Sequence, residues 1–250
     1  MTIEMLNPSP KWGKAPLIEP TGLGYVYIGA DVEAPSRPGP VLRRSRDKKA
    51  LVTRLKAAAA RLEQHDDVEE VRVFSATAFM PGGDYIKKHP EKAPPSFDVI
   101  VLVEAGSEAA VANVVASDEY RALIAELEAK ARRLHVFQAR NPKQLGDSNR
   151  PRQGTFCFTH LIGDDPEVLM ENWEWIGDWY LVETGLANST LLVPLPGQQS
   201  DYVAIEYARW KIGLPRLFLR QLPKRSFWNY ALRNLDAHDV GAWAVFYRLA

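Results

Sequence analysis

The chain has 250 residues, 46% of them apolar, and its 31 basic residues balance its 31 acidic ones. This length fits one large domain or two small ones. A formal net charge of zero argues against nucleic acid as the main partner, because phosphate binding needs a basic excess or a basic patch. No apolar run approaches the roughly 20 residues that span a bilayer, and the N-terminal residues lack the pattern of a secretory signal. We therefore expect a cytoplasmic protein without a membrane span.

Metal binding is also disfavoured by the sequence. Cys157 is the single cysteine, which excludes an intramolecular disulfide and a cysteine-based metal cage. The five histidines do not show the close pairing of a preformed metal site. We expect no metal.

The N-terminal half begins with a proline-rich arm, residues 1–23, and continues with alternating elements over residues 24–140. Period-two alternation predicts strands, and apolar residues at helical spacing predict helices. A long segment rich in Pro, Gly and Lys, residues 81–96, resembles a functional flap more than a hairpin loop. The predicted order is a strand at 25–32, a helix at 47–64, strands at 68–80 and 97–104, a helix from 107 with a break near 117, and a strand at 134–139.

The C-terminal half repeats this order after a linker at residues 141–154. Pro166 directly after two aspartates is a helix start signal, Gly185 ends that helix, and Pro223 interrupts the second helix. The predicted elements of residues 155–250 are strands at 155–162, 189–195, 202–210 and 241–249, and helices at 166–184 and 214–237.

Each half thus reads strand, helix, strand, strand, helix, strand, which is one ferredoxin-like βαββαβ unit. The fold class is α+β, with two tandem units whose antiparallel sheets pack together. Because the halves share the order of elements and not their residues, the repeat is one of pattern. Two packed sheets can enclose a cavity, which predicts a binding or catalytic chamber.

This order, together with the segment SDEYRALIAELEAKARRLHVFQARN at residues 117–141, resembles the dimeric α+β barrel superfamily. The superfamily includes antibiotic-biosynthesis-type monooxygenases, EthD-like and stress-responsive barrel proteins, polyketide cyclases, and haem-binding chlorite dismutases and dye-decolourising peroxidases. The resemblance implies a barrel within one chain and a cleft between sheet and helices or between the sheets. It also allows a homo-oligomer. The GxxDG-type motif of the peroxidases is missing, since Ile162-Gly163-Asp164-Asp165 departs from it.

Alternation assigns strand faces, because successive side chains of a strand point in opposite directions. In the first half Tyr25 and Tyr27 are predicted to face away from the helices. In strand 155–162, Phe156, Phe158 and His160 share the face opposite Cys157, and either face could line the chamber. In strand 202–210 the predicted helix-facing residues are Val203, Ile205 and Tyr207, and the predicted chamber-facing residues are Tyr202, Ala204, Glu206 and Trp210.

Glu206 and His160 are the candidate catalytic residues. A carboxylate surrounded by aromatic side chains suits general acid–base chemistry, although Glu206 could instead pair with Arg209, Arg216 or Arg248. His160 could act as a base or hold haem, with His135 as the alternative haem ligand, or either histidine could be a hydrogen-bonded core residue.

The candidate substrate contacts are aromatic residues with one polar anchor, which suits a flat organic ligand. They are Tyr25, Tyr27, Tyr202, Trp210, Trp173 and Asn229. The tryptophans could instead build a core or a subunit interface. The leading hypothesis is an enzyme without cofactor that performs acid- or base-initiated oxygenation or cyclisation of an apolar, aromatic or polyketide-like compound. The alternatives are a haem oxidoreductase on the same scaffold and a non-catalytic binding or assembly protein.

Overall fold

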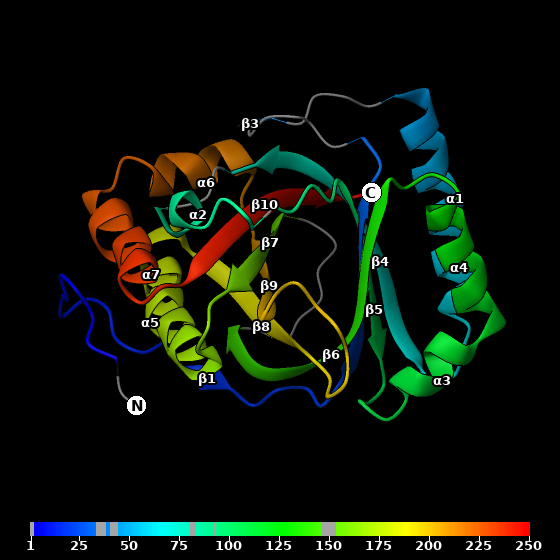
Figure 1. The fold of residues 1–250 in the computed structure, drawn as a ribbon, viewed down its shortest axis with the longest axis horizontal. Coiled ribbons are helices and arrows are strands. Elements are labelled where there is room, and N and C mark those ends of the chain that lie inside the picture. The colour runs from blue at the N-terminus through cyan, green and yellow to red at the C-terminus, as the bar shows by residue number, and fades with distance from the viewer. Residues whose placement is uncertain (1–2, 34–38, 41–44, 81–83, 93, 147–153) are drawn as a thin grey trace.

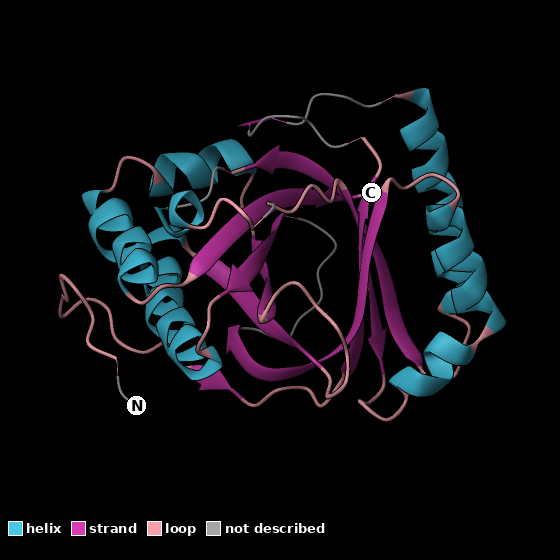
Figure 2. Cartoon of the chain, viewed as in Figure 1, coloured by secondary structure: helices cyan, strands magenta, loops and turns pink. Residues whose placement is uncertain are grey.

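The computed structural model describes residues 3–33, 39–40, 45–80, 84–92, 94–146 and 154–250. Its strands form a central barrel with a helical layer on either side (Figures 1 and 2). Both predicted βαββαβ units are present, in the predicted order. No helix among the described residues is long and apolar enough to cross a bilayer.

The first unit places its helices on one outer side of the barrel (Figure 1). The predicted break in its second helix is confirmed, because the Ser117 hydroxyl accepts a hydrogen bond from Tyr120 N and starts a new helix. The elements are β2 (Gly24–Asp31), α1 (Arg46–Leu62), β4 (Val68–Phe79), β5 (Val99–Ala105), α3 (Val111–Ala116), α4 (Asp118–Glu128) and β6 (Arg133–Gly146).

The second unit places its helices on the opposite side. Asp165 caps its long helix ahead of Pro166, and Gly185 ends the helix in the left-handed conformation with φ of 74°, as predicted. The elements are β7 (Thr155–Ile162), α5 (Pro166–Thr184), β8 (Leu186–Pro194), β9 (Ala204–Trp210), α6 (Leu214–Gln221), the π-helix η1 (Phe227–Leu232), α7 (Arg233–Ala237) and β10 (Gly241–Leu249).

Two antiparallel pairings between the units close the barrel. β4 pairs with β10, with Tyr247 opposite Ala76, and β6 pairs with β8, with Arg140 opposite Val193. The resulting cyclic order is β6, β2, β5, β4, β10, β7, β9 and β8. Closure removes the exposed sheet edges that two separate units would leave.

The segment predicted as a linker is partly strand. β6 extends to Gly146, six residues beyond the predicted end of the first unit, because residues from Lys143 onward pair with β8. The prediction of a loop at 141–146 is therefore wrong, and residues 147–153 lie outside the described residues. Turn-forming residues suggested a loop there, but the partner strand supplies backbone hydrogen bonds that local sequence does not reveal.

The N-terminal arm crosses the helices of the second unit. Gly13 N donates to Asp178 on α5, and Leu6 N donates to Asn234 on α7. The short strand β1 (Leu17–Ile18) then pairs with β6, and β3 (Gly39–Pro40) pairs with β4. The arm therefore adds hydrogen bonds from its backbone to the helical layer of the second unit.

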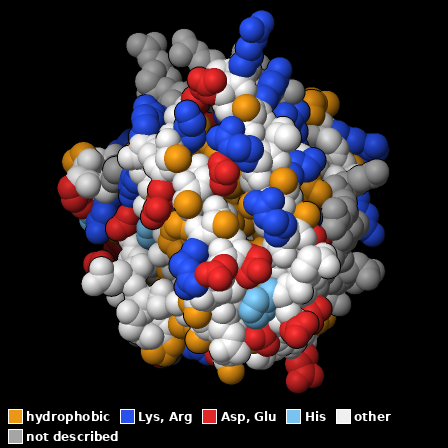
Figure 3. Space-filling model, turned by 90° about the vertical axis from the view of Figure 1, so that its right-hand side faces the viewer, with side chains coloured by type: hydrophobic (Ala, Val, Ile, Leu, Met, Phe, Trp, Pro, Cys, Tyr) orange, Lys and Arg blue, Asp and Glu red, His pale blue; other side chains and the backbone are white. Residues whose placement is uncertain are grey.

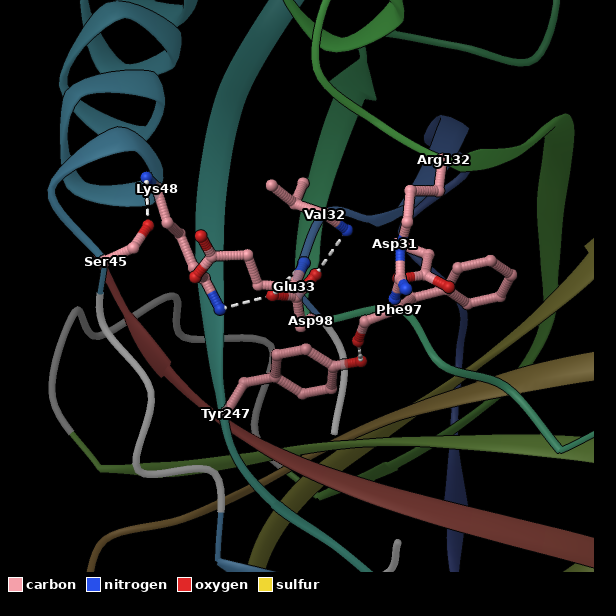
Figure 4. A network of polar contacts seen from close by, with 9 residues as sticks. All are labelled: Asp31, Val32, Glu33, Ser45, Lys48, Phe97, Asp98, Arg132 and Tyr247. Atoms are coloured by element: carbon pink, nitrogen blue, oxygen red, sulfur yellow. Dashed lines mark hydrogen bonds and ion pairs between the residues drawn. The ribbon is translucent and has the colours of Figure 1, made fainter. Parts of the chain in front are cut away.

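A buried polar network fixes one end of the first unit (Figure 4). The Asp98 carboxylate accepts hydrogen bonds from Val32 N at 2.7 Å, Glu33 N at 3.1 Å and Lys48 Nζ at 2.6 Å. Lys48 and Asp98 are 3% and 0% exposed, so this ion pair is shielded from water. The network ties the end of β2 and the start of α1 to the chain entering β5.

Candidate active site

The barrel interior is filled by aromatic side chains. Tyr25, Tyr27 and Tyr202 all belong to this cluster and are at most 4% exposed. The Phe74 ring lies 5.2 Å from Phe156 and 5.1 Å from Phe158, centroid to centroid. The three tyrosines predicted as substrate contacts are therefore core residues between the two sheets.

His160 also lies in the barrel interior and both of its ring nitrogens have partners. Nε2 lies 2.8 Å from the Tyr27 hydroxyl, and Nδ1 lies 3.4 Å from the Trp243 carbonyl oxygen. The tautomer that satisfies both carries its proton on Nδ1 and accepts from Tyr27 at Nε2. Burial lowers the pKa of His160 to about 3, so the imidazole stays neutral near pH 7.

His135 lies at the end of the barrel. Its Nε2 is 3.1 Å from the Ser200 hydroxyl, and its ring stacks on Phe97 at 5.8 Å. Burial lowers its pKa below the ordinary value of 6.5.

These positions do not fit haem. An axial ligand needs a free ring nitrogen directed into a space large enough for the macrocycle. The His160 nitrogens are both engaged inside a packed aromatic core, and the His135 ring lies between Phe97 and Ser200. Neither histidine lines the cavity described below. We therefore derive no catalytic step through haem.

The buried neutral His160 predicts a pH dependence of stability. Its ordinary pKa of 6.5 applies to the unfolded chain, so below about pH 6.5 the unfolded state takes up a proton that the folded state accepts only near pH 3. Stability is fully present above pH 6.5 and is lost as the pH falls. His160→Gln keeps an acceptor for Tyr27 and should reduce the slope of unfolding free energy between pH 5.5 and 4 by about 1.4 kcal/mol per pH unit. Urea unfolding at several pH values measures this slope, and an unchanged slope in His160→Gln contradicts the assignment.

A cavity of about 360 Å³ lies on the other face of the second sheet, beneath its helices. Its volume falls within the range of small-molecule sites. The sheet contributes side chains from β7, β8, β9 and β10, and the helices of the second unit contribute side chains from α5, α6, η1 and α7. The sheet side is lined by Cys157, Thr159, Leu161, Leu186, Glu206, Trp210, Ala242, Ala244 and Phe246.

Small side chains on this sheet face create the space. Ala204 and Ala208 flank Glu206 on β9, and Ala242 and Ala244 line the cavity from β10, on the far side of β7. The corresponding helix-facing residues of β5 in the first unit are Val99, Val101 and Val103, all fully buried against α1 and α4. Valine fills the layer that alanine leaves open, so the second unit has a cavity where the first has a packed core.

Glu206 lies at the sheet side of this cavity with one oxygen held in place. Its Oε1 accepts hydrogen bonds from Ser189 Oγ at 2.7 Å and Trp173 Nε1 at 3.1 Å. Among the described residues no ion pair joins Glu206 to Arg209, Arg216 or Arg248, so the alternative prediction of a structural ion pair has no support there. No donor to Oε2 is recorded among the same residues. The geometry leaves Oε2 able to accept a proton from a bound molecule.

Aromatic rings and a neutral thiol complete the floor. Trp173 and Trp210 are 6% and 4% exposed, and Trp210 Nε1 donates to Thr184 Oγ1 at 2.8 Å. Burial raises the pKa of the Cys157 thiol well above its ordinary value, with the Glu206 carboxylate adding to the effect. Cys157 is therefore a neutral lining residue and not a thiolate nucleophile.

The cavity opening lies between two helices from different halves of the chain. The short helix α2 (Asp84–Lys88) from the predicted flap lies against α7, where Tyr85 N donates to Asp236 Oδ1 at 3.0 Å. Asp84, Lys87 and Trp228 are the exposed lining residues, so the opening lies between α2 and η1. The sequence suggested a flap, but not its position over the other unit.

The structure divides the predicted site residues among four places. Glu206, Trp173 and Trp210 meet at the cavity. Tyr25, Tyr27, Tyr202 and His160 lie inside the barrel, and His135 lies at its end. Asn229 is exposed, and its carbonyl accepts a hydrogen bond from Asn7 of the N-terminal arm.

The predicted faces are reversed for residues 204–210, whereas Tyr202 lies in the barrel and Val203 on the helix side as predicted. Ile205 and Tyr207 point into the barrel, while Ala204, Glu206, Ala208 and Trp210 point toward the helices. Both faces of a barrel strand are buried here, so an apolar set does not mark the helix side. The sequence pattern did not mark Ser189, Tyr180 or the η1 residues that line the cavity, Phe227, Trp228, Ala231 and Leu232, as site residues. The alanines on the same strand face as Glu206 were the available signal.

Comparison with known proteins identifies the fold. No family model and no curated protein matches the sequence. Among solved structures, an anthrone oxidase-like protein superimposes with a TM-score of 0.62 at 11% identity, over 94% of both chains. A candidate monooxygenase from Fusobacterium nucleatum has a TM-score of 0.55 at 9% identity, over 91% of both chains. A candidate chlorite dismutase has a TM-score of 0.51 at 10% identity, over 91% of this chain and 95% of that chain. The chain therefore has the fold of the dimeric α+β barrel superfamily, with both ferredoxin-like units in one polypeptide.

Proposed function

We propose that this protein is a small-molecule enzyme that oxygenates an aromatic, polyketide-like ketone in the cavity beneath α5, with Glu206 as the general base. The observation that carries this proposal is the Glu206 carboxylate, which is anchored at Oε1 and lines an otherwise largely apolar cavity. Pockets of this composition orient flat ligands with a few polar groups.

The fold neighbour described as anthrone oxidase-like supports a tricyclic ketone as the substrate class. In an anthrone, the CH₂ group opposite the carbonyl is acidic, because the anion left behind is delocalised over both rings and the carbonyl oxygen. Trp173 and Trp210 supply flat surfaces for such rings. The same chemistry applies to related phenolic polyketides.

The chemistry requires one base and dioxygen. Glu206 Oε2 takes a proton from the acidic carbon, and the electron pair of the broken C–H bond remains on the ring system. The carbanion adds dioxygen at that carbon. Loss of the second hydrogen with cleavage of the O–O bond forms the new carbonyl and releases water, so one oxygen atom enters the quinone and the other leaves as water. The protein contributes a positioned base and an apolar cavity that stabilises the flat anion.

The alternative of an assembly role for the tryptophans finds little support in their packing. Trp179 is fully buried, and its ring centroid lies 5.8 Å from that of Phe227. The ring centroid of Trp12, in the N-terminal arm, lies 5.0 Å from that of Tyr230. Trp173 Nε1 donates a hydrogen bond to Glu206 Oε1. These aromatic side chains therefore have partners within the chain.

Filling the cavity should abolish ligand binding. In Ala244→Phe a ring replaces a methyl group on the cavity face of β10, whereas Ala57→Phe makes the same change on an exposed position of α1. We expect 1,8-dihydroxyanthraquinone to quench tryptophan fluorescence in the wild type and in Ala57→Phe, and Ala244→Phe to weaken its affinity at least about 10-fold. Equal affinity in all three proteins would place the ligand elsewhere.

A further inference from the structure

The segment from Tyr207 to Leu235 is strongly basic, although the chain as a whole is neutral. It holds seven lysines and arginines and no acidic residue. Four of these basic residues are exposed, namely Lys211, Arg216, Arg225 and Arg233. By contrast, the face formed by α1 and α4 mixes basic and acidic side chains (Figure 3). The surface around α6 and η1 therefore has a local excess of exposed basic residues.

Carboxylates that approach this segment already have partners. Glu183 on α5 pairs with Lys224, and Asp236 on α7 accepts a hydrogen bond from Tyr85 N. Asp84 on α2 pairs with Lys87 at 2.6 Å. Lys224 and Lys87 thus balance two of these carboxylates, and the four exposed cations outnumber the remaining Asp236, which favours an anionic partner.

Large apolar side chains are exposed within the same segment. Leu219 on α6 is 74% exposed and Trp228 on η1 is 52% exposed. Trp228 Nε1 donates to the Leu222 carbonyl at 2.9 Å, which holds η1 against the end of α6. Leu219 lies three residues from Leu222, on the same side of the helix. The apolar residues therefore extend from the α6 surface to Leu222 and Trp228, which both line the cavity.

We infer that α6 and η1 dock this protein on an anionic lipid surface, with Leu219 and Trp228 in the interface and the flanking arginines over the headgroups. An amphipathic segment with cations around Leu and Trp has the composition that binds such interfaces. Tryptophan prefers the boundary between water and acyl chains. A soluble acidic partner would explain the arginines but not the exposed Leu219 and Trp228.

Docking in this orientation would turn the cavity opening toward the bilayer. Apolar ring compounds partition into membranes, so the enzyme would draw its substrate from the lipid phase. This loading role rests on the proposed function, whereas the docking itself does not.

Vesicle flotation tests the docking. The full chain is mixed with vesicles of phosphatidylcholine alone or with 25 mol% phosphatidylglycerol, in 50 mM or 500 mM NaCl. We expect binding to the anionic vesicles at low salt and its loss at high salt. Arg216→Glu/Leu219→Ser/Arg225→Glu should weaken binding by more than about 10-fold, since each surface cation contributes about 5-fold. Lys49→Glu/Lys56→Glu on the exposed face of α1 makes a matched charge change and should bind as the wild type does.

A fluorescence readout places the contact. Brominated lipids in the anionic vesicles should quench tryptophan emission, and Trp228→Phe should remove most of that quenching. Absence of flotation, flotation equally strong on neutral vesicles at both salts, or an unaffected triple variant overturns the proposal. Binding to soluble poly-glutamate without vesicle binding also overturns it, in favour of an acidic macromolecule. Because Glu206→Gln should float as the wild type does, failure of docking and failure of the proposed chemistry are separate results.

Discussion

Glu206→Gln should lower turnover of an anthrone about 10²- to 10⁴-fold, the contribution typical of a positioned general base. The amide has the same shape and still accepts hydrogen bonds from Trp173 Nε1 and Ser189 Oγ, so the cavity should keep its form. It cannot take the proton from carbon. Oxygen uptake and quinone absorbance measure turnover after subtraction of the uncatalysed reaction.

The ligand affinity of the same variant provides the control. The dissociation constant for 1,8-dihydroxyanthraquinone should stay within a few-fold of the wild-type value, because the rings contact the unchanged aromatic walls. His160→Gln should turn over the substrate as the wild type does, since His160 lies inside the barrel. Unchanged turnover in Glu206→Gln contradicts its role as the base.

Lys48→Met should cost about 3–5 kcal/mol of unfolding free energy, because it leaves a buried carboxylate without its cation. Asp98 is fully buried and, among the described residues, would keep the amides of Val32 and Glu33 as donors (Figure 4). Urea unfolding followed by circular dichroism measures the loss. The double variant Lys48→Met/Asp98→Asn removes both charges and should recover part of the lost unfolding free energy.

An exposed ion pair supplies the comparison for Lys48→Met. Arg54 Nε lies 2.6 Å from Glu126 Oε2, and the two side chains are 42% and 34% exposed. Arg54→Met should cost no more than about 1 kcal/mol, because water stabilises the remaining carboxylate. Equal losses for Lys48→Met and Arg54→Met would show that burial of the first pair has no energetic consequence.

Local pattern predicted the elements because the signals act over short distances. Asp165 with Pro166, Gly185 and Ser117 set helix ends through bonds to neighbouring backbone groups, and the structure has them there. Alternation also placed Tyr25 and Tyr27 away from the helices correctly. The twofold order of elements then followed, and with it the fold.

Alternation alone could not assign the strand faces of the second unit. In a barrel covered by helices, both faces of β9 are buried, so Ile205 and Ala208 look equally internal in the sequence. The distinguishing property is volume. Large side chains fill the barrel, whereas Ala242 and Ala244 on the opposite face of the sheet line the cavity beneath the helices. A carboxylate among small residues on one strand face is the sequence signal that marks this cavity.

Contacts between the units were beyond the reach of sequence pattern. The pairing of Lys143 with Leu191 depends on register between distant strands, and the position of α2 on α7 depends on closure of the barrel. The π-helical turn of η1, which brings Phe227 and Trp228 to the cavity, has no local signature of comparable strength.

Hydrogen exchange at the acidic carbon of an anthrone, followed by NMR in deuterated buffer without dioxygen, tests the central claim most directly. It isolates proton removal from oxygenation. The account predicts that the wild-type protein accelerates exchange and that Glu206→Gln reduces it to the buffer rate. Exchange at the buffer rate with the wild type, or equal acceleration by both proteins, would contradict the assignment of Glu206 as the base.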